Sequence, residues 1–398
     1  MNVESEARVS WEVRVLMAVG VIGMAARFVL AALSVGCNDV EIWHDHARVV
    51  LAHGVRYAFE TRAIYNHPPL MGYWSAVSLA LAGPTDFHRF SMWLKLPGLL
   101  VEVLSAVLVY RVAARKGPRA GARAFAAYGV SLVSIIGAGY HGNTDPVYAG
   151  LTLLSAYALE AWEAPFWAGV ALALALNVKL MPIFLVPPLL ARCRSRRAAG
   201  LFLAGLALGV VPFLPFLLTI PRIMYTNMVA YNSLKDEWGL GAFFNYGAWG
   251  GAVKPIARAV AAFYIPIGRY VILLGVLIVA VAAHLRQRWN AYELGALGWA
   301  SFLIFTPGFG VQYTVCIVPL LFAADVGRAL LYSTFTGVFL LVIYTLSMPW
   351  ALPLWANIRD PYAPVAVLFG LIGWAGLVVF VKQTFVYRLI GYAPAPND

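Results

Sequence analysis

The sequence predicts an all-α protein whose helices form one bundle that crosses a membrane about twelve times. Hydrophobic residues make up 62% of its 398 residues and charged residues only 12%, and the mean hydropathy is +0.76. Soluble domains are about 45–50% apolar, so in water this chain would expose too much apolar surface. Inside a bilayer the backbone has to satisfy its own hydrogen bonds, which favours helices.

Twelve apolar segments approach the length of about 20 residues that crosses the hydrocarbon core. They are residues 12–34, 90–112, 123–140, 146–162, 165–179, 181–191, 199–220, 270–285, 291–307, 311–324, 329–347 and 362–382. Two of them, 165–179 and 181–191, are short, so we expect one to be re-entrant or kinked at Pro182. The sequence contains no internal repeat, and residues 1–398 are predicted to form a single integral membrane domain.

Short basic segments predict the orientation, because cytoplasmic loops carry an excess of Lys and Arg. Residues 111–123, 192–197 and 284–288 fall on one side of the alternating spans, together with both termini. The external face then receives the first loop, 35–89, and a second large loop, 221–269. We therefore expect a multi-pass protein of the cell membrane, favour a bacterial inner membrane, and place the working surface on the periplasmic side. The net charge of +11 lies largely in loops, so nucleic acid is not an expected partner.

The first external loop opens with GCNDVEIWHDH (36–46), which gathers three carboxylates and two imidazoles. Apolar side chains at helical spacing predict an amphipathic helix over 40–53 that lies on the membrane and is closed by Gly54. A second interfacial helix is predicted within 66–83, with proline in its first turn, where the missing N–H is harmless. The loop is thus expected to hold two interfacial helices.

The acidic residues at the start of this loop have different explanations. Asn38 and Glu41 have the spacing of a capping box, which would stabilise the start of the first interfacial helix. One cap is sufficient for a helix, so this arrangement does not explain Asp39.

Four short stretches, in this order along the chain, carry a resemblance to a known family. They are NDVE (38–41), YNHPPLMGY (65–73), YHGNTDPVYAGL (140–151) and LALNVKLMPIF (174–184). With them the chain resembles the GT-C glycosyltransferases, integral-membrane enzymes that take a sugar from a polyprenyl-phosphate carrier. It is most similar to the glucosyltransferases and mannosyltransferases that use dolichyl- or polyprenyl-phosphate sugars.

The resemblance extends in order from the first predicted span to the seventh and weakens afterwards. Asn143 and Asp145 stand where the family has its Gln and Asn. A His-Glu-Lys motif that the family has near its penultimate helices is represented here only by PGFGVQY (307–313). These departures concern the recognition of the donor head group and the acceptor, so the resemblance does not identify the sugar.

The resemblance implies an inverting transfer of a hexose to an acceptor hydroxyl, with Asp39 as the general base. A positioned carboxylate commonly accelerates such a proton removal about 10²–10⁴-fold. The leaving phosphate is stabilised by cations or N–H donors, so no general acid is required. Glu41 and Asp45 are expected to support the base, and the donor-binding candidates are His67, His141, Asn143, Asp145, Lys179, Arg222, Arg258, Gln312 and Tyr313.

Several candidates also have a purely structural interpretation. Asp145 has the position of a helix N-cap, and Lys179 can extend its charge to the membrane interface. His141 can be an ordinary hydrogen-bonded interfacial histidine. Glu102 lies in the middle of the second span, where a carboxylate is costly unless it is paired, and we expect Arg27 of the first span to be its structural partner.

A metal site is the alternative to a metal-free mechanism. The residues that offer ligands are Asp39, Glu41, His44, Asp45, His46, His53 and His67. Because each residue of a helix turns about 100°, His44 and His46 would point about 160° apart and would not share one ion. We therefore predict no cofactor, with a divalent metal ion as the less favoured alternative.

Three classes of function follow from these observations. The favoured one is transfer of a hexose from a polyprenyl-phosphate donor to a glycan, glycolipid or lipid-linked oligosaccharide, with the donor, the acceptor and the lipid bilayer as partners. A secondary transporter or lipid-linked sugar flippase is the alternative, although such proteins often consist of two matching halves, which this sequence lacks. A non-catalytic assembly subunit is the third class, but it has no need for clustered carboxylates.

Overall fold

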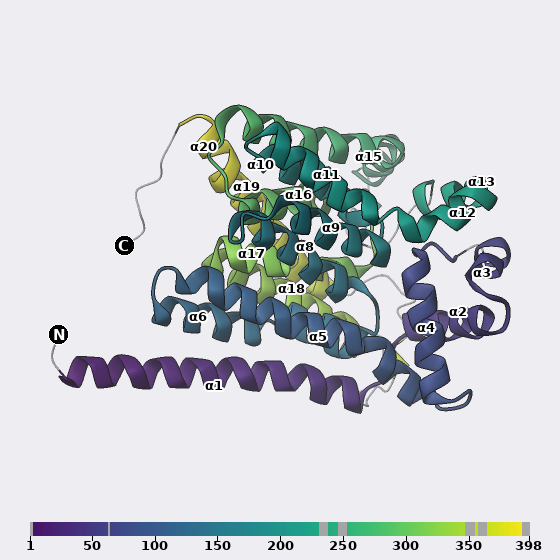
Figure 1. Ribbon diagram of the computed structural model, residues 1–398, viewed down its shortest axis with the longest axis horizontal. Helices are drawn as coiled ribbons and strands as arrows, with labels where there is room; N and C mark the ends of the chain where they lie inside the picture. The colour runs from purple at the N-terminus through teal and green to yellow at the C-terminus, as the bar shows by residue number, and fades with distance from the viewer. Residues whose placement is uncertain are drawn as a thin grey trace.

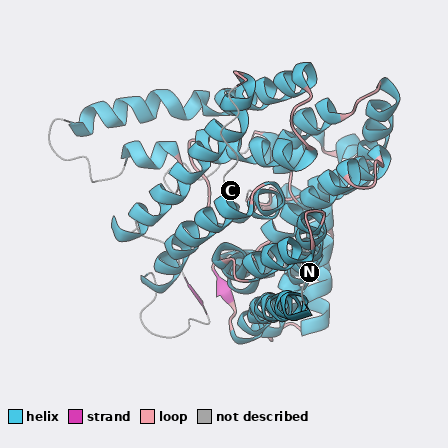
Figure 2. Cartoon of the chain, turned by 90° about the vertical axis from the view of Figure 1, so that its left-hand side faces the viewer, coloured by secondary structure: helices cyan, strands magenta, loops and turns pink. Residues whose placement is uncertain are grey.

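The computed structural model describes residues 3–62, 64–230, 238–245, 253–346, 355–356 and 364–391. These residues are almost entirely helical, as predicted. The exception is one pair of two-residue parallel strands, in which Gly36 lies opposite Trp355 and Cys37 opposite Ala356. Figure 2 shows both strands in magenta. Their pairing ties the segment that follows the first helix to a segment more than 300 residues later.

The helices and strands of the first part of the chain include one π-helical turn, η1, and one 3-10 helix, η2. The elements are α1 (Val3–Leu33), β1 (Gly36–Cys37), α2 (Asp39–His53), α3 (Val55–Thr61), α4 (Pro69–Ala82), α5 (Phe87–Ala114), α6 (Pro118–Gly129), α7 (Leu132–Ser134), η1 (Ile135–His141), α8 (Asp145–Glu160), α9 (Pro165–Val178), η2 (Met181–Leu185), α10 (Val186–Arg192) and α11 (Arg196–Leu208).

The second part adds two further π-helical turns, η4 and η6, and two 3-10 helices, η3 and η5. Its elements are η3 (Val211–Phe213), α12 (Leu214–Thr219), α13 (Pro221–Met224), η4 (Tyr225–Val229), α14 (Leu240–Asn245), α15 (Val253–Arg286), α16 (Ala291–Phe305), η5 (Val311–Val315), α17 (Val318–Ala324), α18 (Val326–Leu346), β2 (Trp355–Ala356), α19 (Pro364–Val381), η6 (Lys382–Val386) and α20 (Tyr387–Leu389).

Within the described residues, six helical stretches are long and apolar enough to cross a membrane. They are Ser10–Leu33, Phe87–Ala114, Arg196–Thr219, Val253–Arg286, Val326–Thr345 and Val365–Leu389. A seventh is obtained if α6 and the helix Leu132–His141, which meet at an angle of 45°, are one bent span. The chain is therefore a multi-pass membrane protein, but the expected number of about twelve spans is not confirmed.

Most of the other predicted spans lie on shorter apolar helices in the interior of the molecule. α9 has 14 residues and α16 has 15. At about 1.5 Å per residue, these helices are shorter than the hydrocarbon core of about 30 Å. In α16 all residues except the last are buried, so its apolar composition reflects packing against other helices rather than contact with lipid.

Residues 35–89, the predicted first external loop, contain three helices, because α3 lies between the two that the sequence predicts. α2 and α4 agree with the predicted helices, and Gly54 ends α2 as expected. In Figure 1, α2, α3 and α4 gather at one end of the molecule with α12 and α13, whereas the start of α1, the turn between α5 and α6, and α20 lie at the other end. A small apolar core that includes Phe59, Tyr65, Phe216 and Met224 joins these five helices. Their position at a membrane interface stays a prediction.

A buried ion pair joins α1 to α5, as the sequence predicts. Nε of Arg27 donates to Oε2 of Glu102 at 3.0 Å, and neither side chain is accessible to solvent. The other guanidinium N–H groups donate to the carbonyl oxygens of Gly23, Tyr128 and Gly129. The last two carbonyls lie at the end of α6, where a helix leaves such oxygens without intrahelical partners. Arg27 therefore stabilises the break between α6 and α7.

Glu102→Gln is expected to destabilise the protein, because it leaves the Arg27 guanidinium buried without a counter-charge. Breaking one side of a buried pair typically costs about 3–5 kcal/mol. The free energy of unfolding in detergent, measured by denaturant titration, tests this value. The control is Glu60→Gln in the exposed pair with Arg56, which should change stability little. Equal effects of the two substitutions would contradict a structural role for the buried pair.

Candidate active site

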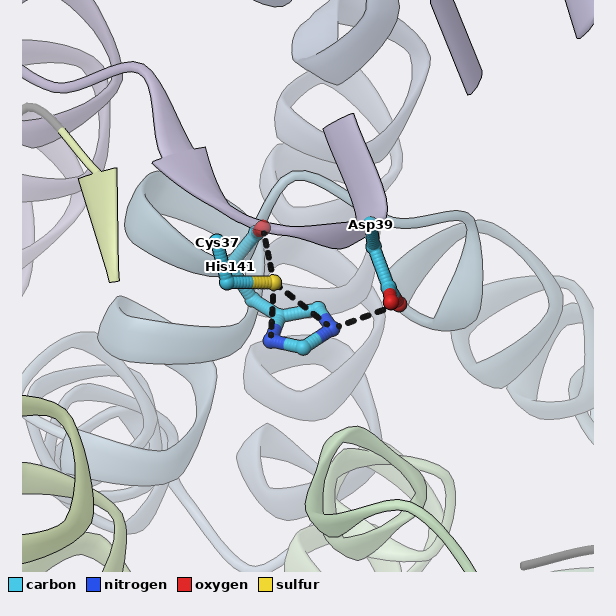
Figure 3. Close-up of side chains that lie close together, drawn as sticks. All are labelled: Cys37, Asp39 and His141. Atoms are coloured by element: carbon cyan, nitrogen blue, oxygen red, sulfur yellow. Dashed lines mark hydrogen bonds and ion pairs between the residues drawn. The ribbon is translucent and has the colours of Figure 1, made fainter. Parts of the chain in front are cut away.

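Asp39, the carboxylate that the sequence places as the base, is the first residue of α2. Its Oδ2 accepts a hydrogen bond from Nε2 of His141 at 3.1 Å and another from Nδ2 of Asn143. His141 is the last residue of η1, and Asn143 lies in the turn before α8. Figure 3 shows the Asp39 carboxylate directed at the imidazole. The fold thus brings two of the donor-binding candidates into contact with Asp39.

Two glycines allow the turn after η1 to approach the start of α2. Gly142 has φ +82°, and a Cβ built on it would lie 2.3 Å from Cγ2 of Val40. Gly36 has φ +112°, and its Cβ would lie 2.6 Å from the carbonyl oxygen of Tyr140. Residues other than glycine rarely adopt such φ values, and a Cβ at either position would clash with these atoms. The contact between Asp39 and His141 therefore depends on both positions lacking a side chain.

The amide of Asn143 is oriented by two donors. Its Oδ1 accepts a hydrogen bond from the backbone N–H of Thr144 at 2.6 Å and from Nε1 of Trp43 at 3.4 Å. With the oxygen engaged in this way, the NH₂ group of the amide faces the carboxylate of Asp39. Trp43 thereby links α2 to the same turn a second time.

The neighbours of Asp39 favour its ionised form. Burial by itself would raise the pKa of Asp39, but the hydrogen bond and charge of His141, the charge of Lys179 and the hydrogen bond from Asn143 together hold this pKa below its usual value. Oδ2 is occupied, whereas Oδ1 has no hydrogen-bond partner among the described residues, and 21% of the side chain is exposed. Oδ1 is therefore the oxygen able to take a proton from a bound alcohol.

Two further residues contact His141, and sequence reasoning missed both. The hydroxyl of Tyr344, on α18, forms a hydrogen bond with Nδ1 of the imidazole. The thiol of Cys37 donates to the carbonyl oxygen of His141 at 3.1 Å, and its sulfur lies against the ring, as Figure 3 shows. Cys37 stands two residues before Asp39, and this proximity in the sequence could have predicted that Cys37 lies at the site. Tyr344 gives no such signal, because its contact depends on how α18 packs.

A second polar cluster lies at the start of α8. Oδ1 of Asp145 accepts hydrogen bonds from Nζ of Lys179 at 3.0 Å and from the hydroxyl of Tyr148 at 2.6 Å. Nζ of Lys179 also lies 3.9 Å from the centre of the Tyr313 ring, a cation–π distance. Asp145 lies in the first turn of α8 and pairs with Lys179, which is only 7% exposed. The helix-capping and interface interpretations of these two residues are therefore wrong.

Two oxygens of this cluster are buried without a hydrogen-bond partner among the described residues. They are Oδ2 of Asp145 and Oγ1 of Thr144. Buried polar atoms are nearly always hydrogen-bonded, so an unpaired carboxylate oxygen needs an explanation such as a bound group or water. The cluster is thus able to accept hydrogen bonds from a ligand that carries hydroxyl groups.

His67 lies close enough to Asp39 and Lys179 for their charges to affect its pKa. Its ring lies 4.4 Å from that of Trp43, measured between centroids, and its Nδ1 is buried without a partner among the described residues. Burial first, and then the charges of Lys179 and His46, hold the pKa of His67 well below its usual value, although Asp39 acts in the opposite direction. His67 is therefore a neutral imidazole with one ring nitrogen available to a ligand.

The other acids of the first loop do not contact Asp39. Glu41 is exposed, and the exposed carboxylate of Asp45 pairs with Nε of Arg62 at 3.2 Å. Asn38 precedes α2, but its side chain makes no capping hydrogen bond, so the predicted capping box is absent from this helix start. The geometry therefore separates Asp39 from its acidic neighbours in sequence.

Three donor-binding candidates lie apart from both clusters. Arg222 on α13 and Arg258 on α15 are exposed, and within the described residues neither side chain forms a hydrogen bond or ion pair with the site. Gln312 in η5 holds its amide over Gly310 instead of contacting Asp39 or Lys179. Of the predicted set, His67, His141, Asn143, Asp145, Lys179 and Tyr313 are the residues that come together.

Cys37, Asp39 and His141 offer one potential metal ligand each, and these atoms lie within 4.8 Å of one another. An imidazole binds a metal through the lone pair of one nitrogen. The Asp39 oxygen lies at Nε2, whereas the Cys37 sulfur lies nearer Nδ1, at 3.3 Å against 3.6 Å, and Nδ1 already contacts Tyr344. A shared ion would have to displace these hydrogen bonds, so the absence of a metal stays a prediction. His44 and His46 contact different aromatic rings, those of Phe90 and Tyr65.

The purified protein is expected to hold no stoichiometric metal at this cluster, because its hydrogen bonds already use the ring nitrogens. Elemental analysis after dialysis should find less than one equivalent of Zn²⁺, Mn²⁺ or Mg²⁺, and added Zn²⁺ should not raise the unfolding temperature. Retention of one equivalent that is lost in Cys37→Ser would show that the cluster is a metal site.

Comparison with known proteins gives one family. Residues 92–307, more than half of the chain, match the model of glycosyltransferase family 87. No curated protein matches the sequence. The matched segment extends from α5 to the residues after α16 and contains His141, Asn143, Asp145 and Lys179. It supports the predicted GT-C superfamily and the prediction of an enzyme. The chain therefore belongs to glycosyltransferase family 87 and is a membrane glycosyltransferase.

Proposed function

We propose that this glycosyltransferase moves a hexose from a polyprenyl-phosphate carrier to a hydroxyl of a glycan or lipid-linked acceptor, with inversion. The observation that carries the proposal is the state of Asp39. One carboxylate oxygen is held by His141 and Asn143, the other is open, and the cation Lys179 lies near enough to lower the pKa of the carboxyl. This combination suits a base that acts beside an anionic leaving group.

The reaction would be a single displacement at the anomeric carbon. The acceptor oxygen forms a bond to that carbon while Oδ1 of Asp39 takes the hydroxyl proton. The bond between the anomeric carbon and the phosphate oxygen breaks, and the carrier leaves as polyprenyl phosphate with the bonding electrons. The base and the leaving group lie on opposite faces of the sugar, so the configuration inverts. The positive charge of Lys179 favours the leaving phosphate.

Sugar recognition is assigned to the unpaired polar atoms around this centre. Three buried atoms have no hydrogen-bond partner among the described residues. They are Oδ2 of Asp145, Oγ1 of Thr144 and Nδ1 of His67. The hydroxyl groups of a hexose would satisfy them.

The polyprenyl-phosphate carrier is proposed from the resemblance to GT-C enzymes, and the membrane side from the position of the site in the molecule. A small, largely apolar cavity lies between α16, α18 and α19 and is lined by Trp238, Phe309, Thr336 and Trp374, among others. The ring of Phe309 stacks on that of Tyr313, so this cavity adjoins the Lys179 cluster. α2, which begins at Asp39, lies at the end of the molecule opposite the basic turn between α5 and α6 (Figure 1), which favours the periplasmic face of a bacterial inner membrane.

The alternatives from the sequence have less support. A transporter or lipid-linked sugar flippase does not need an ionised, half-open carboxylate beside a cation, and an assembly subunit does not need unpaired buried acceptors. The family match favours transfer over both alternatives.

Asp39→Asn should lower the rate of transfer about 10²–10⁴-fold, because the amide cannot take the acceptor proton. The rate is measured in detergent with a panel of polyprenyl-phosphate hexoses and acceptor glycolipids, and binding of the donor is followed by thermal stabilisation, which should persist. The matched control is Asp45→Asn, on the same helix but exposed and paired with Arg62, which should leave transfer unchanged. Full turnover by Asp39→Asn would refute the assignment of the base.

Asp145→Asn should raise the KM for the donor by roughly tenfold, because the amide keeps an oxygen for Lys179 but presents NH₂ where an acceptor oxygen stood. The KM and kcat are measured separately for each sugar donor. Glu160→Gln is the control, since Glu160 forms a comparable pair with Arg192 at 2.9 Å outside the site. If the donor KM of Asp145→Asn equals that of the unaltered enzyme, or if the control shifts it equally, Asp145 does not bind the sugar.

A further inference from the structure

Tyr344, His141 and Asp39 form a continuous hydrogen-bonded series. The hydroxyl of Tyr344 contacts Nδ1 of His141, and Nε2 of the same ring contacts Oδ2 of Asp39. The three residues come from α18, η1 and the start of α2, so the series joins segments that are about 100 and 200 positions apart in the chain. The tyrosine is 5% exposed and the histidine 3%.

The chemistry of the three groups determines where the protons lie. An ionised carboxylate only accepts hydrogen bonds, so Nε2 of His141 must carry a hydrogen when it contacts Asp39. In the neutral imidazole Nδ1 is then an acceptor, and the Tyr344 hydroxyl is the donor that satisfies it. If the ring becomes an imidazolium, the same hydroxyl accepts from Nδ1 instead. In both states the tyrosine favours the arrangement in which Nε2 donates to the carboxylate.

Without the hydroxyl, an imidazolium loses the acceptor for its Nδ1–H, which disfavours the positive charge that faces Asp39. In the neutral ring, the tautomer with hydrogen on Nδ1 is no longer disfavoured. Its Nε2 lone pair would face Oδ2 of Asp39, and two acceptors at 3.1 Å repel each other unless the carboxyl takes up a proton. A protonated Asp39 is not a base. The position of one proton on the imidazole is thus coupled to the charge of the carboxylate.

We propose that Tyr344 is a positioning residue, which holds the His141 ring, charged or neutral, with the Nε2 hydrogen directed at Oδ2 of Asp39 and thereby keeps Oδ1 free and basic. The effect of Tyr344 on catalysis rests on the proposed function, whereas its hydrogen bond to His141 can be tested without any substrate.

Other titratable groups near Asp39 do not replace this hydroxyl. The buried Cys37 thiol has a raised pKa, chiefly because of burial, so it remains a thiol, and it donates to the backbone carbonyl of His141. Lys179 is engaged by Asp145, and His67 packs on Trp43. The titratable groups that face Asp39 are Cys37, His67, His141 and Lys179, from β1, the segment before α4, η1 and the segment after α9.

The test replaces the hydroxyl and keeps the ring, in Tyr344→Phe. Infrared difference spectra recorded against pH follow the Asp39 carboxyl, whose band is identified by its loss in Asp39→Asn. The pKa of Asp39 should rise by about one to two units, because the carboxylate loses a charge-assisted hydrogen bond. The kcat for transfer should fall roughly 10- to 100-fold at neutral pH and its acidic limb should move to higher pH, whereas the donor KM should change little.

Tyr140→Phe is the matched control. Tyr140 packs against Tyr344, with ring centroids 5.1 Å apart, and its hydroxyl is buried without a hydrogen-bond partner among the described residues. Removing it should leave the pKa of Asp39 and the pH profile unchanged. In a His141→Gln background, Tyr344→Phe should have no further effect on the pKa of Asp39, because an amide donor has no tautomer to select.

The pKa of Asp39 tests the positioning role of Tyr344, whereas sugar transfer tests the proposed function. An unshifted pKa of Asp39 in Tyr344→Phe, or an equal shift in Tyr140→Phe, would overturn the positioning role even if the enzyme transfers sugar. A shift in Tyr344→Phe alone supports the role even if none of the polyprenyl-phosphate hexoses is a substrate, which would instead overturn the proposed donor class. Unfolding temperatures of both Phe variants close to that of the unaltered protein would exclude a general loss of packing.

Discussion

The contact between the turn after η1 and the first residue of α2 is the constraint on which the rest of the site depends. A carboxylate at the edge of a membrane protein stays ionised only if donors and positive charge replace the water that it has lost. His141 and Asn143 supply the donors, and Lys179 supplies charge without direct contact. Because both donors bind Oδ2, the carboxylate is stabilised and still has an oxygen for chemistry. A symmetric arrangement, with one donor on each oxygen, would stabilise the charge equally but block the base.

The buried pair between α1 and α5 has a part in this geometry. Arg27 binds the carbonyl oxygens at the end of α6 and so defines where α6 stops and the helix that ends in His141 begins. A Cβ on Gly139 would lie 2.8 Å from the carbonyl oxygen of Arg27, which shows how closely α1 and η1 pack. The π-helical turn, a form found mostly at functional sites, then carries His141 to its position beside α2. A charge pair in the membrane interior thus contributes to the placement of a side chain at its edge.

Sequence reasoning succeeded where the signal was local. The helices follow from apolar composition, and α2 follows from its spacing. The role of Asp39, taken from the short motif that resembles GT-C enzymes, stays a prediction. The count of about twelve spans is not confirmed, because α9 and α16 are short and largely buried, and composition alone does not distinguish a lipid-facing helix from a buried one. The sequence does not predict two contacts of the site, the pairing of Asp145 with Lys179 and the hydrogen bond of Tyr344 with His141. Both depend on the packing of helices that are distant in the chain.

The family match covers the central part of the chain and leaves a flank on each side. The matched residues 92–307 contain His141, Asn143 and the Asp145–Lys179 pair, whereas Asp39 precedes them and Tyr344 follows them. The proposed base and the residue proposed to orient its histidine partner therefore come from the two flanks of the matched region. β1 pairs with β2, which lies just beyond α18, so the same pairing holds the segment before Asp39 to the C-terminal flank. The contacts of Asp39 and Tyr344 with His141 thus form only when both flanks have packed onto the matched region. A chain without these contacts would keep the Asp145–Lys179 pair but lack the proposed base in its ionised, half-open state.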